Sequence, residues 1–180
     1  MNKFKRFPHF RQNNTSDCGP TCLRMIARYY GVDYTAEMLR RHCHVSRRGV
    51  NMLGISEGAE HIGLDTVGVK MTFSQLAEDG LFPCILYWNQ IHFVVCYGIE
   101  RDKAGSYKIH ISDPASQRLT YTREEFERCW IGRRAEDKGC GVALMLEPGE
   151  NWGKVEDEYR KNSRSILSFT RYFVPYRCMI

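Results

Sequence analysis

A cysteine and a histidine that can work together are the first sign of chemistry in this chain. Cys18 and Cys22 lie four residues apart in the segment DCGPTCLRMIARYYG, and His92 and Asp113 lie far along the chain. A thiolate becomes an effective nucleophile when an imidazole stands beside it as a base and a carboxylate orients that imidazole. The chemistry that these residue types support is acyl transfer through a thioester.

Cys18 is expected at the start of a helix. After Asp17, apolar residues recur at helical spacing as far as Tyr30, and Gly31 supplies the stop. Asp17 is the expected cap, and Pro20 is tolerated in the first turn. The positive end of the helix dipole favours a thiolate there, so Cys18 is better placed as a nucleophile than any other thiol.

His92 and Asp113 are expected at the ends of strands. His92 opens one predicted strand, and Asp113 ends the next. If these strands are neighbours in an antiparallel sheet, both side chains project toward the helix that carries Cys18. The pattern of β-branched and aromatic residues predicts strands at 84–88, 92–99, 106–112, 118–121 and 141–146.

Helices are expected mainly before the strands, which implies an α+β domain of two lobes with a cleft between them. The predicted helical segments are 35–42, 51–61, one turn at 74–79 and a late helix at 123–130. A chain of 180 residues fits a single domain. We expect this domain at 1–148, followed by a linker or connector at 149–180.

Composition narrows the classes of protein. Hydrophobic residues make up 43% and charged residues 26%, as in soluble globular proteins. The net charge of +5 comes from scattered basic pairs without aromatic interleaving, so no nucleic-acid partner is expected. The N-terminus has no apolar segment of the secretory kind, and the eight cysteines are therefore expected as free thiols in a reducing cytosol.

The uncharged stretch 80–99 reaches the length of a membrane span, but Pro83 and Asn89-Gln90 favour two buried strands joined by a tight turn.

Other roles remain open for the same residues. Cys18 taken alone fits a small buried core residue, as does Cys22 one helical turn further on. A metal site could combine the two cysteines with His42, Cys43 or His44, although a four-residue step without a matching second pair is unusual for zinc. His92 alone fits a core histidine, and Asp113 before a proline fits a turn.

Four separated elements, taken together, resemble a known family. They are Gln12, then Asp17-Cys18-Gly19-Pro20-Thr21-Cys22-Leu23, then His92-Phe93-Val94-Val95, then Asp113-Pro114-Ala115. In this order they resemble the double-glycine leader peptidase, the bacteriocin-processing domain at the N-terminus of peptidase-containing ABC transporters. The resemblance covers residues 7–148. It departs from the family in the loop GIERDKAGSYK and at Ser116-Gln117, where a glycine is expected.

The resemblance implies a papain-like cysteine protease fold, with an N-terminal helical lobe and a C-terminal antiparallel β-sheet lobe. It implies an endopeptidase that removes the leader of a bacteriocin- or lanthipeptide-type precursor after Gly-Gly. Cys18 would be the nucleophile, His92 the general base and acid, Asp113 the residue that orients His92, and Gln12 the oxyanion donor. No cofactor is expected for this step, and no metal ligands.

The resemblance also implies partners and a location. The substrate would be a precursor whose amphipathic helical leader ends in Gly-Gly. The domain would face the cytoplasm at the bacterial membrane, joined to the transmembrane and nucleotide-binding domains of a transporter. The chain has no GxxxxGK[ST] motif, so ATP is expected only in a domain outside it. The alternatives are a non-catalytic leader-binding domain and a papain-like acyl transferase that passes the acyl group to an amine or thiol.

Overall fold

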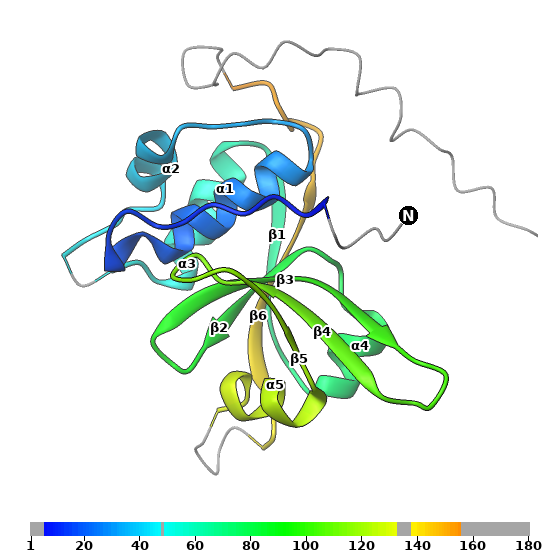
Figure 1. Cartoon of the computed structure of the whole chain (residues 1–180). Helices are drawn as coiled ribbons and strands as arrows, with labels where there is room; N and C mark the ends of the chain where they lie inside the picture. The colour runs from blue at the N-terminus through cyan, green and yellow to red at the C-terminus, as the bar shows by residue number, and fades with distance from the viewer. Residues whose placement is uncertain (1–5, 48, 133–137, 156–180) are drawn as a thin grey trace, which may run out of the picture.

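Three helices form the first part of the fold. The computed structural model describes residues 6–47, 49–132 and 138–155. A short 3-10 helix, η2 (Thr15–Asp17), leads directly into α1 (Cys18–Tyr29), which is followed by α2 (Ala36–His42) and α3 (Met52–His61). Figure 1 shows these helices grouped on one side of the sheet. They form the expected helical lobe.

Side-chain caps fix where most helices start. Thr35 accepts a hydrogen bond from the backbone N–H of Met38 at the start of α2, and Asn51 accepts one from Gly54 at the start of α3. Capping boxes open α4 (Phe73–Asp79) and α5 (Arg123–Trp130). Such bonds satisfy backbone N–H donors that have no partner within the helix. Because only certain polar residues can form them, these helix starts can be recognised in the sequence.

The second lobe is a six-stranded antiparallel sheet in the described part of the chain, with the strand order β1-β6-β2-β3-β4-β5. Its strands are β1 (Leu64–Met71), β2 (Cys84–Trp88), β3 (His92–Arg101), β4 (Tyr107–Ser112), β5 (Arg118–Tyr121) and β6 (Gly141–Pro148). The expected α+β fold is confirmed.

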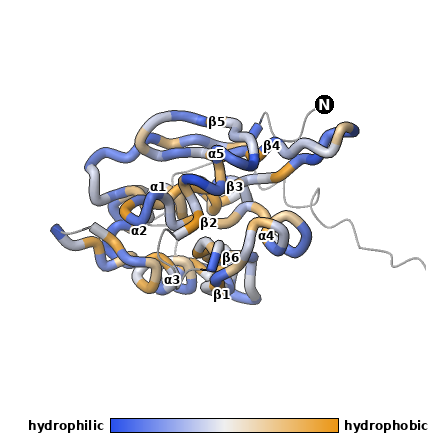
Figure 2. The backbone as a smooth tube through the Cα atoms, turned by 90° about the horizontal axis from the view of Figure 1, so that it is seen from below, coloured by the Kyte–Doolittle hydropathy of each residue, from blue (hydrophilic) through white to orange (hydrophobic). Residues whose placement is uncertain are grey.

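The sheet has apolar side chains on both faces. Ile85 and Val95 pack with α1, α2 and α3, whereas Leu86 and Val94, their neighbours along the strands, pack with residues of α4 and α5 such as Trp130. This alternation is the period of two expected for a strand. Apolar segments, orange in Figure 2, come together where α1 meets β2 and β3. The sheet is thus the middle layer between two helical layers.

Two predictions of secondary structure need correction. Strand β1 was not predicted, because only Leu64 of its eight residues is buried and the segment shows no apolar run. Pairing with β6, from Leu64 opposite Pro148 to Met71 opposite Gly141, holds this edge strand in the sheet. The single turn expected at 74–79 is a two-turn helix, α4.

The uncharged stretch 80–99 forms mainly β2 and β3, as predicted. Asn89 and Gln90 in the turn between them have φ values of 50° and 62°. No helix in the described ranges is long and apolar enough to cross a membrane.

The segment after β6 packs on the helical lobe. The ring centroid of Trp152 lies 6.1 Å from that of Tyr30 and 6.3 Å from that of Tyr34. The expected boundary at residue 148 stays a prediction, because most of the connector, residues 156–180, lies outside the described residues.

Candidate active site

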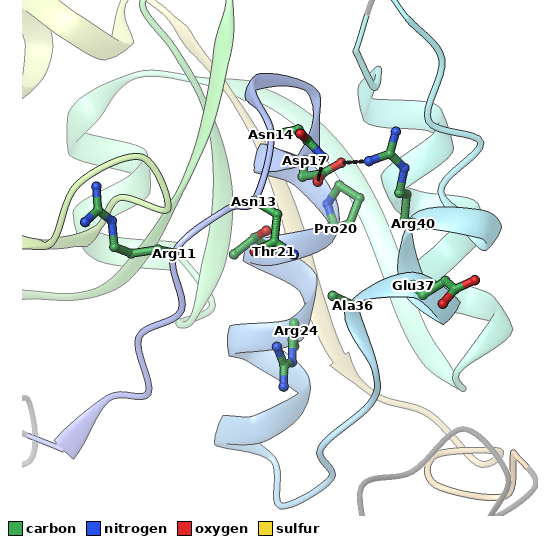
Figure 3. Close-up of a pocket in the computed structure, with 10 residues that line it drawn as sticks. All are labelled: Arg11, Asn13, Asn14, Asp17, Pro20, Thr21, Arg24, Ala36, Glu37 and Arg40. Atoms are coloured by element: carbon green, nitrogen blue, oxygen red, sulfur yellow. Dashed lines mark hydrogen bonds and ion pairs between the residues drawn. The ribbon is translucent and has the colours of Figure 1, made fainter.

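Cys18 is the first residue of α1, as predicted, and only 5% of it is exposed. Gly19 allows the start of α1 to lie close to α3, because a Cβ at that position would lie 2.6 Å from side-chain atoms of Ile55 and Val50. Asp17 occupies the N-cap position but makes no side-chain cap bond. Its carboxylate binds Arg40 of α2 instead (Figure 3), so the expected capping bond is absent.

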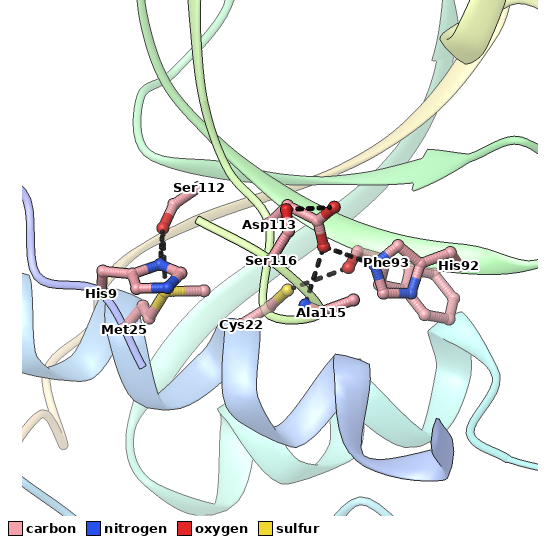
Figure 4. Close-up of polar contacts among 9 residues, drawn as sticks. All are labelled: His9, Cys22, Met25, His92, Phe93, Ser112, Asp113, Ala115 and Ser116. Atoms are coloured by element: carbon pink, nitrogen blue, oxygen red, sulfur yellow. Dashed lines mark hydrogen bonds and ion pairs between the residues drawn. The ribbon is translucent and has the colours of Figure 1, made fainter. Parts of the chain in front are cut away.

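His92 and Asp113 come together at one end of the sheet (Figure 4). Strands β3 and β4 are antiparallel neighbours, with Val95 opposite Ser112, so the start of β3 lies beside the residue that follows β4. His92 Nε2 and Asp113 Oδ1 are 2.8 Å apart. The juxtaposition predicted from adjacent strand ends is confirmed.

The loop after β4 holds the Asp113 carboxylate in place. Oδ1 accepts a hydrogen bond from the Ala115 backbone N–H at 2.8 Å, and Oδ2 accepts one from the Ser116 hydroxyl at 3.1 Å. Burial raises the pKa of Asp113, but the bonds from His92, Ala115 and Ser116 outweigh it, and the pKa is lowered. Ser116, which stands where the family resemblance leads one to expect a glycine, thus supports the carboxylate directly.

The environment of His92 favours its protonated form. Burial lowers the pKa of His92, but the Asp113 carboxylate and the Cys18 thiol, as hydrogen-bond partners and as charges, raise it to about 9. At neutral pH the imidazole is therefore charged. This imidazolium has the Cys18 thiol as a hydrogen-bond partner.

Cys22 is a core residue, as expected from its place one turn along α1. It is fully buried, and its Sγ donates a hydrogen bond to the Phe93 carbonyl at 3.4 Å. Burial raises the pKa of the Cys22 thiol well above its usual range, so it stays protonated. Among the described residues, no group of three or more His, Cys, Asp or Glu side chains is arranged so that it could hold a metal ion.

Gln12 lies beside the same loop as Asp113. Its backbone N–H donates to the Pro114 carbonyl at 2.9 Å. The Gln12 Oε1 atom is buried and has no hydrogen-bond partner among the described residues. The backbone bond brings the N-terminal segment to the end of the sheet that carries Asp113.

His9 is a further residue at this place, and no motif in the sequence points to it. Its Nδ1 lies 2.8 Å from the hydroxyl of Ser112, the residue before Asp113, and that hydroxyl donates to Met25 Sδ at 3.1 Å (Figure 4). Burial lowers the pKa of His9, so its ring is neutral at neutral pH. No flanking pattern marks His9, because its contact depends on how the N-terminal segment crosses α1 and β4.

The site therefore combines a thiol at a helix start, a charged imidazole and a carboxylate fixed by three hydrogen bonds. This is the set of groups for nucleophilic attack on a carbonyl followed by proton transfer to the leaving group.

Comparison with known proteins gives the same picture. Residues 6–135 match the Peptidase C39 family. The probable microcin-H47 secretion/processing ATP-binding protein of Escherichia coli is 32% identical over 164 residues, which are 91% of this chain and 21% of that protein. The lactococcin-G-processing and transport ATP-binding protein of Lactococcus lactis subsp. lactis is 29% identical over 167 residues, or 90% and 21%.

Two solved structures are similar over most of the chain. The first is a double glycine motif protease from an AMS/PCAT transporter in complex with the leader peptide. It is 33% identical with a TM-score of 0.68, and the match covers 78% of this chain and 91% of that one. The second is the peptidase domain of Streptococcus ComA, described as a bi-functional ABC transporter. It is 25% identical with a TM-score of 0.66, over 79% and 99% of the two chains.

Proposed function

The chain belongs to the peptidase C39 family, and from this membership we propose that it cuts the leader from a bacteriocin- or lanthipeptide-type precursor after a Gly-Gly pair. It is a cysteine peptidase of the α+β, papain-like kind. The observation that carries the proposal is the bond between His92 and Asp113 opposite the start of the helix that bears Cys18.

In the proposed reaction, the Cys18 thiolate attacks the carbonyl carbon of the second glycine. His92 then gives its proton to the leaving amine, which departs as the N-terminus of the mature peptide and leaves the leader bound as a thioester. A water molecule, deprotonated by His92, hydrolyses that thioester and restores the thiolate. Asp113 orients the imidazole throughout and needs no proton of its own.

Gln12 is proposed to stabilise the oxyanion that forms in both steps. Its side-chain amide N–H and the backbone N–H of Cys18 would donate to that oxygen. The position of Gln12 beside Pro114 supports this role. Selectivity for Gly-Gly is proposed to come from a channel too narrow for any Cβ, which rejects larger residues by steric overlap.

The partners follow from the relatives. The chain spans about a fifth of the length of the bacteriocin-processing relatives it matches, 21% for the microcin-H47 protein. We propose that the cleavage is coupled to export by a parent ABC transporter and that its transmembrane and nucleotide-binding domains are the partners. The peptidase would then act at the cytoplasmic side of the membrane on a precursor with an amphipathic helical leader, without a cofactor for the cleavage.

The test is cleavage of a synthetic precursor with an amphipathic leader that ends in Gly-Gly, followed by mass spectrometry. We expect one cut after Gly-Gly, and a rate at least about 10³-fold lower for Cys18→Ala because the nucleophile is gone. A precursor with Gly-Ala in place of Gly-Gly is the matched control and is expected to remain intact.

Three results would contradict the proposal. Cysteine-independent cleavage would remove Cys18 from the mechanism. Binding of the leader by the wild type without any cut would point to the non-catalytic alternative. Transfer of the leader acyl group to an added amine or thiol in preference to water would point to an acyl transferase.

A further inference from the structure

We propose that the ion pair between Asp17 and Arg40 is a positioning pair for the nucleophile: Arg40 draws the Asp17 carboxylate away from the start of α1 and neutralises it, so that the positive end of the helix acts on Cys18. The inference rests on the proposed role of Cys18 as the nucleophile.

The start of α1, which η2 leads into directly, differs from the starts of the other α-helices in the described part of the chain. Of the five α-helices there, α2, α3, α4 and α5 each have a cap residue whose side chain accepts a backbone N–H bond. Asp17 is among the residue types that cap best, yet its side chain makes no such bond. The exception falls at the helix that begins with Cys18.

The Asp17 carboxylate is bound by two side chains that lie outside α1. Arg40 Nη1 of α2 lies 2.8 Å from Asp17 Oδ1, and Asn14 Nδ2 donates to Oδ2 at 3.2 Å. The Asp17 side chain is only 11% exposed, so the carboxylate depends on these two partners. Figure 3 shows the carboxylate turned toward Arg40, and both residues line a small hollow between α1 and α2.

Other charged groups near this hollow do not replace Arg40. Arg24 is bound to Asp33 at 3.2 Å, and Glu37 lies 3.8 Å from Arg41. Arg11 also lines the hollow, and its side chain points away from Asp17 in Figure 3.

From the sheet side, His92 faces Cys18 and is itself paired with Asp113. Arg40 is therefore the cation that neutralises the carboxylate next to the nucleophile.

The pair matters because of charge. A carboxylate in the capping position would occupy the first N–H groups of α1 and place a negative charge beside the thiolate, which disfavours the thiolate. With the carboxylate held by Arg40, the helix start keeps its positive character for Cys18. Replacing Arg40 and removing the charge of Asp17 must then change the reactivity of Cys18 in opposite directions. If the ion pair only held α1 and α2 together, both changes would lower that reactivity.

The experiment measures alkylation of Cys18 by iodoacetamide as a function of pH, with the modified peptide identified by mass spectrometry. It uses the full chain and no peptide substrate, so its result is independent of the Gly-Gly proposal. The variants are Arg40→Met, Arg40→Lys and Asp17→Asn. Arg41→Met is the matched control, because Arg41 neighbours Arg40 on α2 but pairs only with the exposed Glu37.

We expect the midpoint of the rate-against-pH curve to rise by about one unit in Arg40→Met, which is about tenfold slower alkylation below the midpoint. Arg40→Lys keeps the charge and should stay near wild type, as should Arg41→Met. In Asp17→Asn the midpoint should fall.

The proposal is overturned if Arg40→Met and Asp17→Asn shift the midpoint in the same direction, or if both lower the rate at every pH with no shift. Circular dichroism shows whether Arg40→Met folds. If it does not, Asp17→Asn alone tests the proposal, and an alkylation midpoint that rises or stays fixed in this variant overturns it.

Discussion

His92 is subject to opposing influences, and their balance sets the chemistry of the site. Burial disfavours the charged ring, whereas Asp113 and Cys18 favour it and raise its pKa to about 9. The imidazolium at neutral pH thus depends on its partners. Since the free enzyme needs the charged ring beside the thiolate, activity should be lost as the pH rises through this value.

A first prediction concerns Asp113→Asn. Removing the carboxylate removes a cause of the raised pKa of His92, so the alkaline limb of kcat/KM should move from about pH 9 toward neutral pH. The rate at neutral pH should fall by about 10²- to 10⁴-fold, since the imidazole also loses its orienting partner. A pH–rate profile with a Gly-Gly precursor measures both.

The control for this prediction is Asp102→Asn. Asp102 lies in the β3–β4 loop, where its Oδ1 accepts backbone N–H bonds from Ala104 and Ser106. Its profile should match wild type. An alkaline limb that stays near pH 9 in Asp113→Asn would show that Asp113 does not set the pKa of His92.

The sequence was sufficient to predict three of the side chains at the site but not their supports. Cys18 follows from helical periodicity, and the contact of His92 with Asp113 follows from strand ends, because both arguments use local patterns. His9 contacts Ser112 from a distant segment of the chain, and Ser116 binds Asp113 within one loop. Neither kind of contact produces a periodic pattern in the sequence.

Among the helices and strands, the N-terminal capping residues explain which helix starts could be predicted. The starts at Thr35 and Asn51 are confirmed because a polar residue precedes an apolar periodic run. Strand β1 was missed because an edge strand has few buried residues, and its place is set by pairing with β6, which lies some seventy residues further along the chain. Local signals do not carry such pairing.

A second prediction concerns the packing of α1 on α3. Gly19→Ala would place a methyl group 2.6 Å from side-chain atoms of Ile55 and Val50, so either these side chains or the start of α1 with Cys18 must shift. We expect a loss of about 1–3 kcal/mol in the free energy of unfolding. We also expect kcat to fall by about tenfold or more, because small displacements of a nucleophile are costly.

Urea denaturation and cleavage kinetics test this prediction, with Gly68→Ala as the matched control. Gly68 also lacks a Cβ, but nothing lies within 4 Å of the place a Cβ would take. The control should stay within about 0.5 kcal/mol of wild type, as is usual for surface substitutions. Unchanged kcat in Gly19→Ala would mean that the close approach to α3 does not position Cys18.

For the whole molecule, the histidines contribute to the pH dependence of stability in opposite directions. The pKa of His92 is raised to about 9, so the folded state binds more protons than the unfolded state between 6.5 and 9, and stability falls as the pH rises through this window. Burial lowers the pKa values of His9 and His42. Their unfolded forms bind more protons below 6.5, so stability also falls as the pH decreases.

Urea midpoints measured from pH 5 to 9 in the presence of a reducing agent check this third prediction. His92→Gln should flatten the alkaline slope and leave the acid slope in place. A midpoint that rises steadily from pH 7 to 9 in the wild type would contradict the assignment.

The place of β6 in the sheet has a consequence for biosynthesis. It is the last strand in the described chain, yet it lies between β1 and β2. On the ribosome, a nascent chain that has not reached Gly141–Pro148 therefore has β1 without its partner and β2 with an open edge. Gln12, Cys18, His92 and Asp113 have by then all been translated. The sheet that carries His92 can therefore be completed only after β6 has been synthesised, which delays completion of the sheet relative to synthesis of these four residues.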